Sequence, residues 1–144
     1  MRRALPLLAL VGALLVGCGL DSDDEPGTDA EAGGGSVAAT SITIEVRTEA
    51  DAEPNVMTLE CDPVGGDHPQ AQEACAALAS AGADVLEPVP ADQVCTMIYG
   101  GPQTATVKGT VDGADVDATF TRENGCEVDR WETLGTTFFD VPLQ

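Results

Sequence analysis

The chain has 144 residues, of which 25 are Asp or Glu and only 6 are Lys or Arg, so its formal net charge is −19. This excess of acid excludes nucleic acid and anionic membrane surfaces as electrostatic partners, because both would repel the chain. The length supports one modest domain. A single histidine, His68, and the absence of Gly-x-Ser-x-Gly and His-Glu-x-x-His strings indicate that the protein is not an enzyme.

Residues 1–17 are predicted to be an export signal rather than part of the fold. Arg2 and Arg3 form a basic start, and the apolar run at 4–16 is shorter than the roughly 20 residues that span a bilayer. Residues 15–18, Leu-Val-Gly-Cys, resemble the lipobox of bacterial lipoproteins. The resemblance implies an acylated Cys18 at the extracellular face of the cell membrane. The alternative is an ordinary signal followed by a free cysteine, which would release the protein.

Residues 18–40 are predicted to form a flexible tether. The segment is acidic, contains Gly33-Gly34-Gly35-Ser36 and has no basic residue. Such a composition cannot bury enough apolar surface to offset the entropy lost on ordering. The tether would hold the next domain away from a negatively charged surface. It lacks the shaped loop of a calcium site, so we expect no metal there.

The domain at 41–144 is predicted to begin with a hairpin. Apolar and polar residues alternate at 41–47 and again at 57–61, which is typical of strands with one buried face. The turn at 53–55 lies between these two strands and would let them pair.

A helix is predicted to follow the first hairpin. Pro69 would occupy the first helical position, Asp67 or His68 would cap it, and Gly82 would end it. His68 has no neighbour in sequence that would make it a base, so we interpret it as a structural residue at the start of the helix.

Residues 88–102 are predicted to be irregular, and 104–121 form the clearest hairpin in the chain. Apolar and polar residues alternate on both sides of Asp112-Gly113, a dipeptide that favours the positive φ angles of a two-residue turn. Asp115 and Asp117 would then share the solvent face rather than bind a metal.

The C-terminal part is predicted to contain a turn, a short helix and a closing strand. These lie at 124–125, 127–134 and 138–141. Together the elements predict an α+β domain, with an antiparallel sheet of about five strands and two helices.

Four cysteines lie in the predicted domain: Cys61, Cys75, Cys95 and Cys126. An even number of cysteines in a small exported domain indicates disulfides, and the spacings do not match Cys-x-x-Cys zinc or redox motifs. Counting alone leaves three pairings open.

Five segments of the domain resemble one protein family. They contain the four cysteines in order and a Cys-x-Met-x-Tyr loop, and they lie at 58–63, 68–69, 74–78, 95–99 and 124–127. They are similar to the subtilisin-inhibitor-like family of secreted bacterial serine-protease inhibitors. The resemblance implies a five-stranded sheet with two helices, disulfides from Cys61 to Cys75 and from Cys95 to Cys126, and a homodimer through the sheet.

The resemblance also implies a reactive loop whose scissile bond joins Met97 to Ile98. A serine protease binds an extended backbone and takes one side chain into its specificity pocket, so a tight inhibitor offers a braced, substrate-like strand. Met97 suits the apolar pocket of a subtilisin-like or chymotrypsin-like enzyme. The expected loop residues are Val94, Cys95, Thr96, Met97, Ile98, Tyr99 and Gly100, with the Asn124 amide holding loop carbonyls.

Two features depart from the family pattern. Thr96 stands where the family commonly has proline, and a lipobox followed by an acidic tether is unusual there. A second hypothesis is therefore a cell-envelope lipoprotein that binds or scaffolds and keeps the fold with an inactive loop. A protease-inhibition titration distinguishes the two. Neither hypothesis requires a cofactor.

Overall fold

The computed structural model describes residues 39–142, so the predicted signal, Cys18 and most of the tether lie outside the described residues. The described domain contains a five-stranded antiparallel sheet in the order β3-β2-β1-β4-β5. Its elements are β1 (Thr40–Arg47), β2 (Asn55–Cys61), β3 (Gly65–Gly66), α1 (Ala71–Ala81), the 3-10 helix η1 (Ala83–Leu86), β4 (Thr104–Val111), β5 (Ala114–Phe120) and α2 (Gly125–Phe139). The predicted class, with five strands and two helices, is confirmed.

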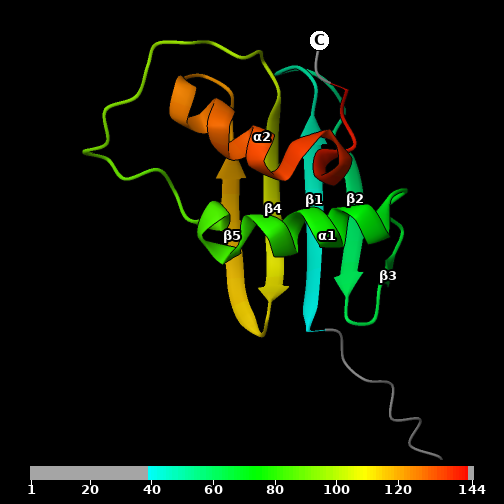
Figure 1. Ribbon diagram of the computed structural model, residues 1–144. Coiled ribbons are helices and arrows are strands. Elements are labelled where there is room, and N and C mark those ends of the chain that lie inside the picture. The colour runs from blue at the N-terminus through cyan, green and yellow to red at the C-terminus, as the bar shows by residue number, and fades with distance from the viewer. Residues whose placement is uncertain (1–38, 143–144) are drawn as a thin grey trace, which may run out of the picture. The chain divides into compact units, whose positions relative to one another are not determined.

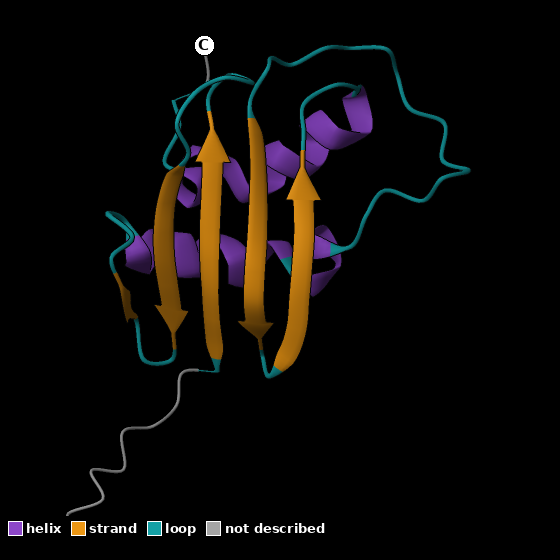
Figure 2. Cartoon of the chain, turned by 180° about the vertical axis from the view of Figure 1, so that it is seen from behind, coloured by secondary structure: helices purple, strands orange, loops and turns teal. Residues whose placement is uncertain are grey.

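Both helices pack on one face of the sheet and leave the other face open (Figures 1 and 2). In β1, the side chains of Ile42, Ile44 and Val46 are buried while the alternate ones face solvent, as the pattern predicts. The described part of the chain contains no helix both long and apolar enough to cross a membrane. The core is formed mainly by Ile42, Ile44, Val46, Leu59, Leu78, Val107, Phe120, Trp131, Leu134, Phe138 and Phe139.

The predicted hairpin at 104–121 is confirmed. Strands β4 and β5 pair antiparallel across the turn, where Asp112 and Gly113 have φ angles of 50° and 79°. Asp115 and Asp117 are exposed on these strands, and Asp117 pairs with Lys108 at 3.4 Å.

The predicted closing strand at 138–141 is wrong. Phe138 and Phe139 end α2 instead, which changes direction at Gly135, where φ is 78°. Both phenylalanines are fully buried, and the ring of Phe139 stacks on Trp131 with centroids 4.1 Å apart. The periodicity of a short apolar run is the same for a buried strand and for a buried helix end. The run at 138–141 therefore does not show which of the two it forms.

The fifth strand of the sheet is β3, which consists of two glycines. At Gly66, where φ is 90°, an added Cβ would lie 2.2 Å from the carbonyl oxygen of Thr58 in β2. Only glycine therefore allows this close pairing. This strand lies between the predicted first hairpin and the predicted helix, where the sequence has no strand pattern.

The start of α1 also differs from the prediction. The helix begins at Ala71 without a side-chain cap, and Asp67 instead accepts hydrogen bonds from the backbone N–H and the hydroxyl of Thr58 in β2. His68 is buried; its Nδ1 accepts from the Gln70 backbone N–H at 3.1 Å, and its Nε2 lies 3.0 Å from the carbonyl oxygen of Phe138. With Nδ1 accepting, Nε2 donates, so His68 joins the start of α1 to the end of α2.

The hydrogen bonds between Asp67 and Thr58 predict a stabilisation that is lost in acid. Hydrogen bonds from the Thr58 backbone and hydroxyl lower the pKa of Asp67 below its ordinary value of 3.8. The stabilisation is therefore complete above the pKa that Asp67 has in the unfolded chain. It is lost as the pH falls through the lower pKa that Asp67 has in the folded protein. We expect Asp67→Asn to lower the free energy of unfolding near pH 7 and to lose this effect under acid, measured by urea unfolding. An equal difference near pH 2 would contradict the prediction.

Candidate functional site

A long loop joins η1 to β4 and projects away from the sheet on the β5 side (Figure 1). Its most exposed apolar side chains are Val94 and Met97, which are 95% and 94% exposed, and Ile98 and Tyr99 are also largely exposed. Four exposed apolar residues so close together cost solvation free energy without stabilising the domain. Such a patch indicates a surface that binds another molecule.

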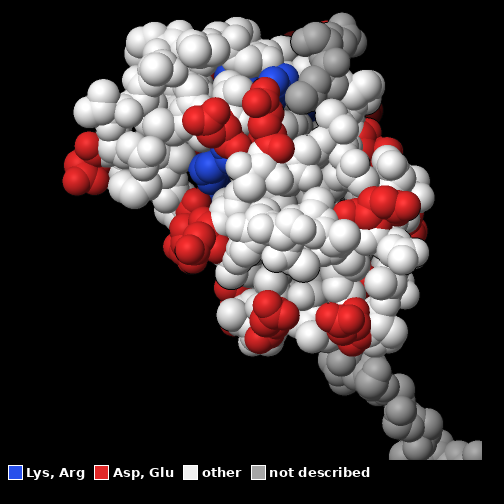
Figure 3. Space-filling model, in the orientation of Figure 1, with Lys and Arg blue, Asp and Glu red and all other residues white. Residues whose placement is uncertain are grey.

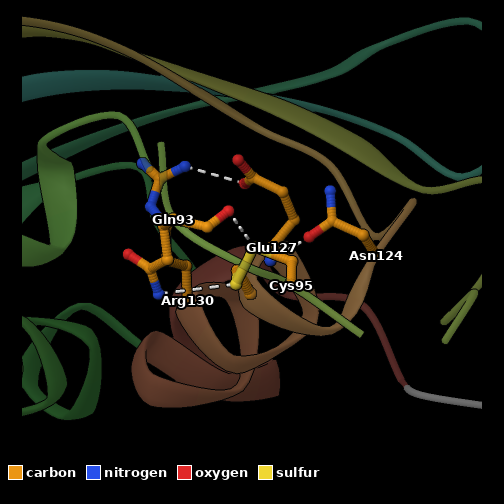
Figure 4. Close-up of a disulfide and its surroundings, with 6 residues drawn as sticks. Gln93, Cys95, Asn124, Glu127 and Arg130 are labelled. Carbon is orange, nitrogen blue, oxygen red and sulfur yellow. Dashed lines mark hydrogen bonds and ion pairs between the residues drawn. A yellow bond between two sulfur atoms is a disulfide. The ribbon is translucent and has the colours of Figure 1, made fainter. Parts of the chain in front are cut away.

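A disulfide holds the N-terminal side of this loop. Cys95 is bonded to Cys126 in the first turn of α2, with Cα atoms 5.4 Å apart (Figure 4). The next residue, Thr96, accepts a hydrogen bond at its carbonyl oxygen from the backbone N–H of Gly125, at 2.9 Å. The second disulfide joins Cys61 to Cys75, so the structure has the sequential pairing that the family resemblance implies.

A second backbone contact holds the C-terminal side of the loop. The Gly100 N–H donates to the carbonyl oxygen of Arg122 at 2.7 Å. Arg122 is itself buried, and its guanidinium lies 3.3 Å from Gln103 Oε1 and 3.7 Å from Glu132 Oε1. Residues 97–99 therefore span two fixed points, one in the first turn of α2 and the other on the segment that connects β5 to α2.

Asn124 supports the loop differently from the expectation. Its side-chain oxygen accepts from the Glu127 backbone N–H at 3.2 Å, which caps the start of α2. The loop carbonyl at Thr96 is held instead by the backbone of the next residue, Gly125. Asn124 thus acts through the helix end, which carries both Gly125 and the cysteine bonded to the loop.

Arg130 fixes the same helix to the rest of the domain. Its guanidinium donates to the carbonyl oxygens of Val85 in η1 and Thr119 in β5. The same guanidinium pairs with the Glu127 carboxylate at 2.8 Å (Figure 4). It also lies over the ring of Phe120, 4.4 Å from the centroid. Arg130 therefore connects the base of the loop to η1, β5 and α2. No residue pattern in the sequence indicates this role of Arg130.

Thr96 and Gly125 fit together closely. A Cβ added at Gly125 would lie 2.0 Å from Thr96 Oγ1, so any side chain there would displace the loop or rotate a stiff β-branched residue. We expect Gly125→Ala to lower the free energy of unfolding by about 1–3 kcal/mol. Adding Thr96→Ala removes the clashing oxygen and should restore part of the loss. Chemical denaturation of both single variants and the double variant measures this coupling, and strictly additive losses would contradict it.

Acidic residues outnumber basic ones, by 25 to 6 in the whole chain. Acidic side chains are spread over the face in Figure 3. The four cations of residues 39–142 all pair with acidic side chains, in Arg47–Glu45, Lys108–Asp117, Arg122–Glu132 and Arg130–Glu127. Within the same residues, no group of three or more His, Cys, Asp or Glu side chains could hold a metal ion.

Comparisons with known proteins show which family and which relatives this chain is similar to. A family model described as subtilisin inhibitor-like matches residues 36–124. Subtilisin inhibitor-like protein 1 of Streptomyces cacaoi is 41% identical over 99 residues, which cover 66% of this chain and 88% of that protein. A subtilase-type protease inhibitor of Streptomyces fradiae is 38% identical over 108 residues, which cover 69% of this chain and 75% of that protein.

Solved structures are also similar to this chain, and one of them contains an inhibitor bound to a protease. It is the crystal structure of Streptomyces caespitosus sermetstatin in complex with Bacillus licheniformis subtilisin. The sequence identity is 26% and the TM-score is 0.43, and the match covers 69% of this chain and 94% of that one.

Proposed function

Because the chain belongs to the subtilisin inhibitor-like family, we propose that it inhibits subtilisin-like or chymotrypsin-like serine proteases as a substrate-like ligand. The observation that carries the proposal is the position of Met97, which is 94% exposed between two points where the loop is fixed. A protease can reach this side chain without disturbing the core. The rest of the loop has little freedom left to lose on binding, which favours affinity.

In the proposed complex, the backbone around Met97 lies in the substrate cleft of the protease. The Met97 side chain enters the specificity pocket, where an unbranched apolar chain is accommodated well. Val94 would enter a second apolar pocket, and Tyr99 would contact the leaving-group side as an aromatic anchor. The high exposure of all three side chains in the free protein supports these roles.

The two fixed points explain how such a loop would inhibit instead of being consumed. If the Met97–Ile98 bond is cut, Cys95 and Thr96 still hold the new carboxyl end against α2. Gly100 still holds the new amino end against Arg122. Because the two ends stay close together, religation competes with their separation.

A titration of purified protein against subtilisin, chymotrypsin and trypsin tests the proposal. We expect stoichiometric inhibition of subtilisin, inhibition of chymotrypsin, and weak inhibition of trypsin. Rapid cleavage without inhibition, or no effect on any of the enzymes, would reject it. That result would favour the second candidate, an envelope module with an inactive loop.

We propose separately that Cys18 is acylated and tethers the inhibitor to the outer face of the cell membrane. The lipobox-like sequence before Cys18 supports this proposal, and two or more acyl chains would give stable anchoring where one would be marginal. We expect Cys18→Ser to remove the protein from the membrane fraction or to block its processing. Fractionation and mass spectrometry measure this effect. Unmodified wild-type protein found only in the medium would contradict it.

The open face of the sheet is the surface through which we propose that two copies pair. It carries mainly Thr and charged side chains, such as Thr43, Thr106 and Lys108. The helices leave this face uncovered, and the reactive loop extends to one side of it (Figure 2). A dimer formed there would leave both loops free to bind.

A further inference from the structure

The two methionines within residues 39–142 lie in opposite environments. Met57 in β2 faces the core and is only 4% exposed, whereas Met97 is 94% exposed on the loop. The other sulfur atoms of this part of the chain are in disulfides, from Cys61 to Cys75 and from Cys95 to Cys126. The Met97 thioether is therefore the one reduced sulfur within this range that a solute can reach freely.

We propose that Met97 is an oxidation site that switches off inhibition. The inference rests on the proposed function, in which Met97 fills the specificity pocket. The co-reactant is a peroxide: the Met97 sulfur attacks the O–O bond, one S–O bond forms, and the O–O bond breaks. Sulfur loses two electrons, and the two peroxide oxygens gain one each. With hydrogen peroxide, the leaving hydroxide takes the proton of the transferred hydroxyl and departs as water. The product is methionine sulfoxide, which methionine sulfoxide reductases convert back to the thioether.

The effect of Met97 oxidation on binding would be large, because in the proposed complex this side chain lies in the protease pocket and is fully removed from water. A sulfoxide carries a strongly polar oxygen, and an apolar pocket offers it no hydrogen-bond donor. The inhibition constant should therefore rise by about tenfold to a hundredfold.

The effect on the fold would be small. The loop is held by Cys95, by the carbonyl of Thr96 and by the N–H of Gly100, and none of these contacts uses the Met97 side chain. Oxidation would thus block the pocket without loosening the loop. Oxidation of Met57, by contrast, would place a polar group in the core and destabilise the domain.

The test treats the protein with hydrogen peroxide and follows three readouts. Peptide mapping locates the added oxygen, subtilisin inhibition gives the change in the inhibition constant, and denaturant unfolding reports on the fold. We expect Met97 to be oxidised before Met57, inhibition to weaken by about tenfold to a hundredfold, and the unfolding midpoint to stay unchanged.

Two variants serve as controls, each judged by its treated against its untreated inhibition constant. Met57→Leu should remain sensitive to peroxide, and Met97→Leu should become insensitive. If protein oxidised at Met97 inhibits as well as untreated protein, or if Met97→Leu stays sensitive, the inference is overturned while the proposed function stands. If untreated protein does not inhibit subtilisin, the proposed function and the switch both fail.

Discussion

Met97→Lys is expected to convert the protein from an inhibitor of subtilisin-like enzymes into an inhibitor of trypsin. The trypsin pocket contains a buried carboxylate, which the Met97 thioether leaves unpaired and a lysine ammonium would neutralise. The substitution adds only an exposed charge to the free protein, because Met97 is 94% exposed. The backbone contacts on both sides of the loop remain, so the specificity should change without loss of the fold.

Met97→Asp should abolish inhibition of subtilisin. A carboxylate in an apolar pocket costs several kcal/mol, and each 1.4 kcal/mol weakens binding tenfold, so we expect a loss of about a thousandfold or more. Inhibition constants of both variants against subtilisin and trypsin measure the effect. Val64→Asp is a matched control, since Val64 is also an exposed apolar residue but lies outside the loop. If Met97→Asp inhibits both enzymes like the wild type, Met97 is not the specificity residue.

The strands with one buried face were predictable because their periodicity is a local property of the sequence. Ile42, Ile44 and Val46 alternate with polar residues, and the Asp112-Gly113 turn fixes the register of the second hairpin. Strand β3 has no such signal, since its two glycines pair with β2 only because they lack side chains. Its existence depends on a neighbour in space that the local sequence does not specify.

The end of α2 escaped prediction for a related reason. Phe138 and Phe139 are both buried because the bend at Gly135 turns the last residues of the helix toward the core. The helical spacing of Trp131, Leu134 and Phe138 is visible in the sequence, but a glycine directly after Leu134 is also a candidate helix end. The pattern was therefore interpreted as a short helix followed by a strand.

Sequence reasoning predicted which residues form the loop but not most of the contacts that hold them. The cysteines and Met97 can be recognised in the sequence by their side chains, and the family resemblance implies how the cysteines pair in disulfides. The hydrogen bonds from Gly125 to Thr96 and from Gly100 to Arg122 use backbone atoms, which every residue possesses. Only the fold shows that the end of β5, the first turn of α2 and the segment between them lie where they support both sides of the loop.

The two disulfides are expected to contribute similarly to stability and very differently to inhibition. They close loops with sequence separations of 14 and 31 residues, which correspond to about 3 and about 3.7 kcal/mol in the chain-entropy model. The paired serine variants at Cys61 and Cys75, and at Cys95 and Cys126, should therefore have similar free energies of unfolding. Only the second bond borders the proposed reactive loop, so only its loss should loosen residues 94–96, which would then be held by the Thr96 carbonyl alone.

Reordering three residues on binding costs about 1 kcal/mol each, so the Cys95→Ser/Cys126→Ser variant should inhibit subtilisin about a hundredfold less tightly. It should also be consumed as a substrate, because one end of a cut loop would be held only by the Thr96 carbonyl. The Cys61→Ser/Cys75→Ser variant is the control for lost stability. Inhibition constants and cleavage rates, measured where both variants are folded by circular dichroism, separate the effects. Equal losses of inhibition would mean that Cys95–Cys126 stabilises the domain without bracing the loop.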